Sequence, residues 1–200
     1  MFTRRTLLAA TLAIPLAPAT FGERLLPFAT RLALAARRQI GVTRSYDAAY
    51  VRLAYPMGDV DRSRGVCTDV VIRAYRDAFD VDLQKRVHED MLGAFSDYPR
   101  IWGLSRPDSN IDHRRVPNLE RFLERNGCAL PLPQERSGWQ PGDLYTMRLG
   151  GRLPHIGIVS DRMTVDGHPY VLHNIGLGTQ EEDILGQFED ERRFRYDVTV

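Results

Sequence analysis

The run Gly65-Val-Cys-Thr-Asp-Val-Val-Ile-Arg-Ala-Tyr75 is the stretch on which the fold prediction depends. Apolar residues recur at helical spacing between charged ones across residues 67–79. That pattern predicts an amphipathic helix with one face in the core. Its first residue is a cysteine, and the preceding Arg64-Gly65 is typical of a turn. The sequence therefore predicts a thiol at the very start of a buried helix.

The second half of the chain changes from helical to strand patterns. Short β-prone runs cover residues 144–149, 156–160 and 170–175, and Asp166-Gly167 is a hairpin signal between the last two. Further helical patterns lie earlier, over residues 24–40, 87–95 and 119–126. Helices followed by an antiparallel sheet indicate the α+β class. We expect the cysteine helix to pack on that antiparallel β-sheet.

Composition limits the classes of function. The chain has 200 residues and a formal net charge of +1, so no excess of positive charge points to nucleic acid as a partner. After the N-terminus, no segment approaches the roughly 20 apolar residues of a membrane helix. We expect one ordinary domain with a substantial core. The oligomeric state stays open.

The N-terminus resembles an export signal. Arg4-Arg5 gives a positive start, residues 7–16 are apolar but short, and Ala17-Pro-Ala19 offers small residues to a signal peptidase. We predict a cleaved signal peptide at residues 1–19 and a periplasmic location for the mature protein. The paired arginines leave both the general and the twin-arginine export routes open, and an uncleaved anchor is the alternative.

The two cysteines differ in their surroundings. A thiol at position 67 would face the N–H groups and the positive dipole of its helix, which favour the nucleophilic thiolate. Cys128 follows Gly127 and precedes an apolar run, which suits an inert, packed thiol. A disulfide between Cys67 and Cys128 is the alternative, and it would exclude a nucleophile.

A thiol nucleophile needs a base within reach. His155 begins the run His-Ile-Gly-Ile-Val, and His173 lies on the next expected strand. Histidines on neighbouring strands can lie side by side, so that one orients the other. No histidine or cysteine has the spacing of a known metal site, and we expect neither a metal nor a cofactor.

Several runs carry a resemblance to known families. Gly65-Val-Cys-Thr-Asp69, Gln140-Pro-Gly-Asp-Leu144, His155-Ile-Gly-Ile-Val159 and Leu172-His173 resemble the NlpC-type cell-wall cysteine peptidases and amidases. Residues 37–196 resemble more closely a bacterial family known only as domain of unknown function 1287. That resemblance is carried by the run that opened this section, extended by three others: Val87-His-Glu-Asp-Met91, Asn110-Ile-Asp-His-Arg-Arg-Val-Pro-Asn-Leu119 and Pro154-His-Ile-Gly-Ile-Val-Ser-Asp161.

The resemblance implies a papain-like fold and a division of the chain. Residues 20–36 would be an N-terminal helical segment. Residues 37–200 would be an NlpC-like thiol hydrolase domain, with an insertion at about 80–138 that the smallest NlpC-type members lack.

The resemblance also implies roles for individual residues. Cys67 would be the nucleophile, His155 the base and His173 the orienting third member. Asn174 is the alternative third member, because neighbouring strand residues point to opposite faces. A tyrosine upstream of the cysteine would line the oxyanion site, and Tyr55 fits by spacing, with Tyr46 as its rival.

Four residues are candidates for binding substrate. Asp69 stands where the NlpC-type motif has a small residue, so it could bind an amine, pair with an arginine or simply stabilise the helix start. His113, Arg114 and Arg115 lie in the insertion, where an arginine could bind a carboxylate with two hydrogen bonds. A solvated polar loop is the alternative for these three.

The sequence thus predicts an exported cysteine hydrolase that cleaves an amide or peptide bond, with a peptidoglycan peptide as its leading substrate. Two alternatives use the same fold. One is a non-catalytic cell-wall binding module, and the other is an acyl or peptidyl transferase.

Overall fold

Helix α3 (Cys67–Phe79) begins and ends at the residues that the sequence predicts. The computed structural model describes residues 21–199. Val66 adopts an extended conformation ahead of the helix, and Asp80 ends it in the left-handed conformation. Most of the α3 side chains are buried, so this helix lies within the protein and not on its surface.

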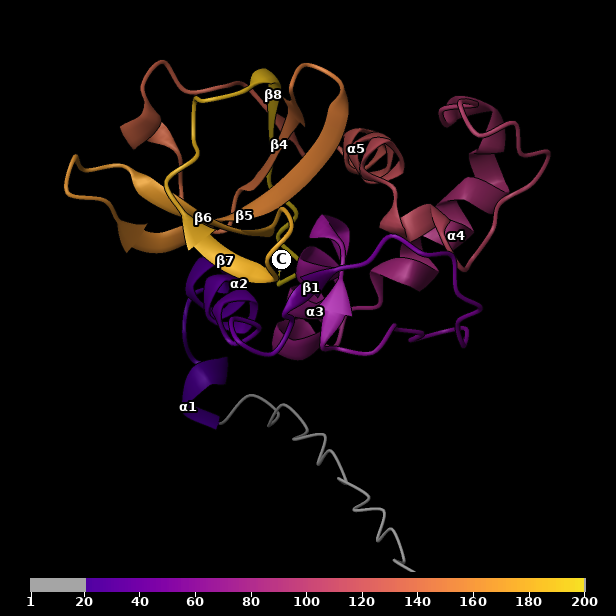
Figure 1. Ribbon diagram of the computed structural model, residues 1–200, viewed down its shortest axis with the longest axis horizontal. Coiled ribbons are helices and arrows are strands. Elements are labelled where there is room, and N and C mark those ends of the chain that lie inside the picture. The colour runs from indigo at the N-terminus through magenta and orange to yellow at the C-terminus, as the bar shows by residue number, and fades with distance from the viewer. Residues whose placement is uncertain (1–20, 200) are drawn as a thin grey trace, which may run out of the picture.

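The sheet has six strands, and each neighbouring pair runs antiparallel. In spatial order the strands are β3 (Ala129–Leu130), β8 (Glu189–Phe194), β4 (Leu144–Leu149), β5 (Leu153–Met163), β6 (Pro169–Asn174) and β7 (Thr179–Glu182). The chain therefore folds as an α+β protein with an antiparallel sheet, which confirms the coarse prediction (Figure 1).

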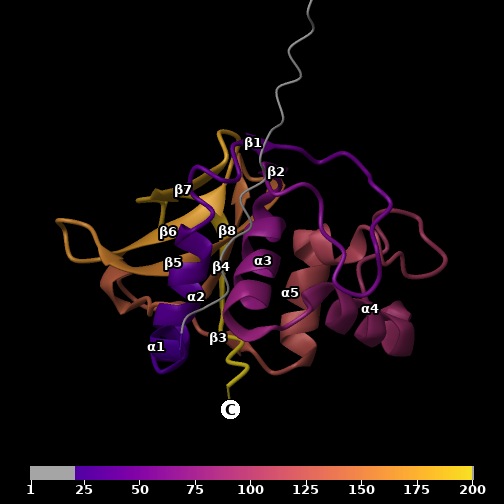
Figure 2. The same cartoon turned by 90° about the horizontal axis from the view of Figure 1, so that it is seen from below.

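The helices cover one face of this sheet. Figure 2 views the molecule from the helical side, with α2 (Phe28–Arg37) and α3 in front of the strands and α5 (Val116–Arg125) beside α3. Helix α4 (Leu83–Ala94) packs outside α3 and α5. Helix α1 (Phe21–Arg24) and three short 3₁₀ helices complete the helical elements of residues 21–199. The 3₁₀ helices lie at Phe95–Asp97, Asp112–Arg114 and Arg136–Gly138.

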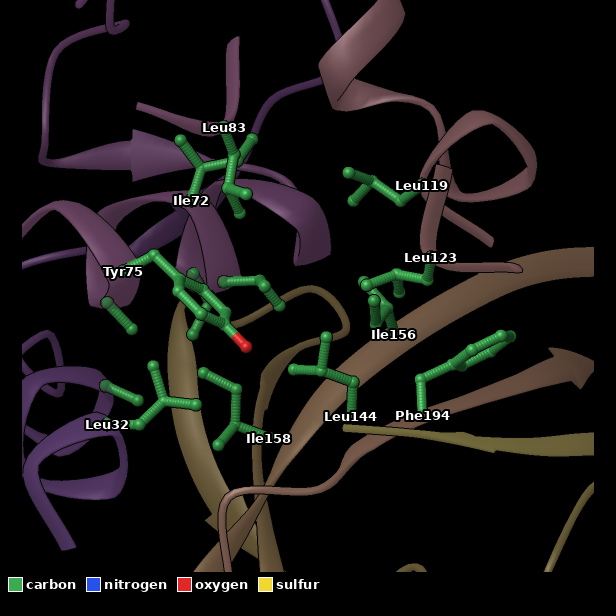
Figure 3. Close-up of a cluster of buried hydrophobic side chains, with 14 of the residues drawn as sticks. Leu32, Ile72, Tyr75, Leu83, Leu119, Leu123, Leu144, Ile156, Ile158 and Phe194 are labelled. Carbon is green, nitrogen blue, oxygen red and sulfur yellow. The ribbon is translucent and has the colours of Figure 1, made fainter. Parts of the chain in front are cut away.

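The main core lies between the helices and the sheet. Figure 3 shows Tyr75 of α3 beside Leu32 of α2 and Ile158 of β5, with Leu144 and Phe194 further along the sheet. These side chains are almost completely shielded from solvent. Burial of such side chains is the dominant favourable term in folding, so the position of α3 is fixed by packing. A second, smaller cluster around Trp139 and Tyr145 covers the opposite face of the sheet.

Parts of the predicted secondary structure were wrong, for identifiable reasons. The helix expected over residues 24–40 is shorter, because α2 begins only after Pro27 and ends at Arg37. The strand runs at 179–182 and 189–194 were missed, since they are rich in charged residues and alternate weakly. The region predicted as an insertion contributes α5 to the main core through Leu119 and Phe122.

Two further predictions concern the signal peptide and membrane-spanning helices, and the structure can address them only within the residues that it describes. The signal peptide expected at 1–19 lies outside them. Within residues 21–199 no helix combines the length and the apolar character needed to cross a membrane.

Candidate active site

The site is built around the first residue of α3. Cys67 is the first helical residue, and its side chain is 3% exposed. Asp69 closes the helix start, because its Oδ2 accepts a hydrogen bond of 2.7 Å from the Val66 N–H. This contact stabilises the first turn, as a carboxylate near a helix N-terminus should. The thiol is therefore held by a helix whose end is fixed.

Three hydrogen-bond donors surround the sulfur. They are the backbone N–H groups of Ile156 and Thr68 and the hydroxyl of Tyr46. Ile156 is the residue directly after His155, so the thiol lies beside the backbone of the predicted base. The start of α3 and the start of the buried part of β5 thus meet at this point.

The ionisation of the thiol differs from the prediction. Burial raises the pKa of Cys67 to about 11, and the nearby Asp69 charge adds to this effect, while the surrounding N–H donors lower it less. The helix start alone had predicted a lowered pKa and a thiolate. Removal of the sulfur from water outweighs the helix dipole here, because desolvation penalises the charged form. The resting group is a neutral thiol.

The two predicted histidines form a buried pair. His155 Nε2 lies 3.0 Å from His173 Nδ1, and the rings meet edge to face. Burial lowers the pKa of His155 to about 3 and that of His173 to about 4, so both rings are neutral near pH 7. A carboxylate oxygen of Glu182 lies 3.0 Å from His173 Nε2, off the line of an ideal hydrogen bond. Sequence reasoning missed Glu182, because the strand β7 that carries it was not predicted.

Gly157 makes this pairing possible. A Cβ at this position would overlap the Val171 side chain and lie 3.1 Å from the Cβ of His173. The strand register explains the crowding, since Ile158 pairs with Leu172 and so places residue 157 opposite residue 173. A larger residue would push β6, and with it His173, away from His155.

The tyrosine at the thiol is Tyr46 and not Tyr55. The short strands β1 (Ser45–Tyr46) and β2 (Arg64–Gly65) run parallel and pair Tyr46 with Gly65, two residues before the cysteine. Tyr55 instead packs its ring edge against His88, at 5.1 Å between centroids. Spacing along the chain favoured Tyr55. The parallel pairing of β1 with β2 instead brings Tyr46 to the cysteine.

Asn174 has a structural position. Its Nδ2 donates to the carbonyl oxygens of Gly65, at 2.9 Å, and of Ser45, at 3.4 Å. It therefore ties the turn before Cys67 to strand β1. Of the two residues predicted as the third member, His173 is the one that contacts His155.

Two of the four predicted substrate-binding residues hold one another. Arg114 donates to Asp69 from Nε and from Nη2, each at 2.9 Å, and both side chains are almost fully buried. Arg114 also donates to the carbonyl oxygens of Asp47 and Ala49. Each of these two side chains therefore has its charge paired within the protein. For Asp69 this is the alternative that the sequence offered, a pair with an arginine.

His113 is also turned away from solvent. It is 2% exposed, and its burial lowers its pKa to about 3.

Arg115 has a different position, because it lines a cavity of about 410 Å³ that opens at Cys67. The cavity is bounded by four parts of the chain, within residues 46–50, 66–67 and 102–117 and at residue 154. Its lining is formed by Tyr46, Ala48, Tyr50, Val66, Cys67, Trp102, Ile111, Arg114, Arg115, Val116, Pro117 and Pro154.

Cys67 and Cys128 are both free thiols in the structure. Cys128 is half-buried, and its burial raises its pKa. Over residues 21–199 no group of three or more His, Cys, Asp or Glu side chains is placed to hold a metal ion.

The comparisons with known proteins give the family. Residues 33–196 match the model of the family described as "Domain of unknown function (DUF1287)". The chain belongs to this family. It is also 55% identical over 171 residues to "Uncharacterized protein YijF" of Escherichia coli (strain K12), a match that covers 84% of this chain and 83% of that protein. The matched range of the DUF1287 model contains every residue of the site described above.

The Arg114–Asp69 pair should be important for stability. Replacement of Arg114 by Met leaves a buried carboxylate without its partner, and we expect a loss of about 3–5 kcal/mol in the free energy of unfolding. The matched control is Arg64→Met, which breaks an ion pair with Asp47 whose side chains are 42% and 29% exposed. That change should cost about 1 kcal/mol or less. Equal midpoints of urea unfolding for the two variants would contradict this role of Arg114.

Proposed function

We propose that this DUF1287 protein is an exported cysteine hydrolase with an NlpC-type, papain-like fold, which cleaves an amide bond in peptidoglycan peptides. The observation that carries the proposal is the position of the Cys67 sulfur against the Ile156 N–H, directly after His155. A thiol at a helix start, a histidine one residue before the Ile156 N–H that reaches it, and a second histidine paired with the first would serve as nucleophile, base and orienting group.

The order of the elements supports the NlpC-type assignment. The cysteine begins a helix that packs on an antiparallel sheet, the first histidine lies on β5, and the second lies on the neighbouring strand β6. This is the order that the resemblance of the sequence motifs implies. The export that goes with it rests on the signal-like residues 1–19.

The neutral thiol and imidazole define how the reaction begins. His155 Nε2 is engaged by His173, so Nδ1 is the nitrogen that can take the thiol proton. The sulfur attacks the substrate carbonyl as this proton leaves, forming the C–S bond and an oxyanion. The amide nitrogen then takes the proton from His155 and departs, and water hydrolyses the thioester with the same histidine as base.

Neighbouring groups stabilise the charges that form. The Tyr46 hydroxyl, which donates to the sulfur at rest, and the N–H groups at the start of α3 can donate to the oxyanion. The positive charge on the histidine pair is balanced by Glu182, which lies at the solvent end of the pair with its side chain 46% exposed. This carboxylate offsets the cost of forming an imidazolium in a buried place.

Removal of the thiol tests the proposal. The Cys67→Ala variant should lose hydrolysis of purified peptidoglycan by about 10⁴-fold or more, because the nucleophile acts as a unit with its base. The matched control is Cys128→Ser, which should retain activity. Release of peptide fragments, separated by chromatography and identified by mass, is the measurement. Undiminished release by Cys67→Ala would overturn the mechanism, and an added amine acceptor that appears in the products would identify transfer instead of hydrolysis.

One observation favours the second candidate function, a non-catalytic cell-wall binding module. The thiol is buried and protonated at neutral pH, as that alternative expects. The binding module predicts retention of the wild-type protein on sedimented peptidoglycan, with no released fragments over extended incubation. The hydrolase predicts fragments that depend on Cys67.

The pH dependence of thiol alkylation provides an independent check. A pKa raised to about 11 means that the thiolate fraction of Cys67 still increases above the ordinary range of a free cysteine. The rate of alkylation by iodoacetamide should therefore rise about tenfold per pH unit between pH 7 and pH 10, and level off only near pH 11. Site-specific labelling is followed by peptide mass spectrometry. A plateau at or below pH 8 would contradict the neutral resting thiol.

A further inference from the structure

The cavity at Cys67 is lined by aromatic rings, aliphatic side chains and arginines. Tyr46, Tyr50 and Trp102 supply the rings, while Arg114 and Arg115 supply the charge. Among the described residues that line this cavity, none is an aspartate or a glutamate. The carboxylates that pair with the two arginines, Asp69 and Asp112, do not belong to the lining, so the charged side chains that face a ligand are guanidinium groups.

The two arginines differ in what they can offer. Arg114 donates two hydrogen bonds to the Asp69 carboxylate and two more to backbone carbonyl oxygens. The Arg115 side chain donates from Nη1 to Asp112 at 3.1 Å, and Asp112 itself is 1% exposed. A guanidinium carries five N–H donors, so Arg115 keeps donors for a ligand.

Arg115 is also held in place. Its guanidinium carbon lies 4.0 Å from the centroid of the Trp102 ring, a cation–π contact, and Asp112 anchors it at the edge. A fixed guanidinium beside an aromatic wall is a good donor to a planar carboxylate, because the geometry is formed before binding.

We propose that this cavity selects a substrate that carries a free carboxylate, which Arg115 binds against Trp102 while the scissile carbonyl lies at Cys67. The inference rests on the proposed function and adds its substrate class. A ligand that presents an amino group is not the preferred one under this proposal. Asp69, the acidic residue at the start of α3, is already paired with Arg114 and cannot offer its charge to an amine. The substrate therefore presents the acidic end of a peptide, and not its amino end, to this cavity.

The test uses Cys67 as a reporter of what the cavity attracts. The full mature chain is alkylated at pH 9 with iodoacetate, iodoacetamide or (2-bromoethyl)trimethylammonium, which are anionic, neutral and cationic. Peptide mass spectrometry gives each rate at Cys67, and Cys128 serves as the reference thiol in the same molecule. We expect the ratio of the iodoacetate rate to the iodoacetamide rate to be about 5-fold higher at Cys67 than at Cys128. The ratio of the (2-bromoethyl)trimethylammonium rate to the iodoacetamide rate should be lower at Cys67 than at Cys128.

Variants assign the effect to one side chain. Arg115→Gln should abolish the anion preference, and Arg115→Lys, which keeps the charge, should retain part of it. Arg106→Gln is the matched control, because Arg106 is an exposed arginine on the same segment that does not line the cavity. Thermal unfolding of each variant verifies that it is folded.

The outcomes separate the two proposals. An anion preference that is absent in the wild-type chain, or that Arg115→Gln leaves unchanged, overturns the carboxylate site and leaves the hydrolase untouched. A Cys67 that none of the three reagents modifies while Cys128 reacts overturns the proposed function, and the inference falls with it. A preference lost in Arg115→Gln and kept in Arg106→Gln supports the inference.

Discussion

The buried ion pair between Asp69 and Arg114 is the constraint on which the site depends. Asp69 closes the start of the cysteine helix through the Val66 N–H, and Arg114 holds that carboxylate with two hydrogen bonds. The same guanidinium donates to the backbone after strand β1, while the Thr68 hydroxyl donates to the Arg114 carbonyl. One pair therefore joins the cysteine helix, the strand that carries Tyr46 and the wall of the cavity. Such a pair requires both partners, since either charge alone would be buried without compensation.

Burial creates a conflict between structure and reactivity. The helix start and three hydrogen-bond donors favour a thiolate at Cys67, but exclusion of water raises its pKa to about 11. The same exclusion keeps His155 and His173 neutral, which is the form that can accept a proton. In the proposed mechanism the proton leaves the thiol only as the substrate carbonyl is attacked. The protein then rests as a protected thiol, and the charges appear together and next to their partners.

The sequence predicted the features that depend on local pattern. Helix α3, the strands of the hairpin around Gly167 and the proximity of His155 to His173 all follow from periodicity and turn chemistry. Tyr46 could not be chosen over Tyr55, because only the parallel pairing of β1 with β2 brings residue 46 to the thiol. Glu182 was missed with its charged, weakly alternating strand. The raised pKa of Cys67 could not be predicted either, since it arises from how completely the folded chain covers the sulfur.

The central claim is that Cys67 forms a covalent bond to its substrate. The most direct measurement is mass spectrometry of the purified protein, mixed with peptidoglycan fragments and quenched in acid at short times. The account predicts an added mass on the peptide that contains Cys67, equal to the acyl part of the cleaved fragment, which decays as product accumulates. Product release without any adduct on that peptide, and with equal yield from the Cys67→Ala variant, would contradict it.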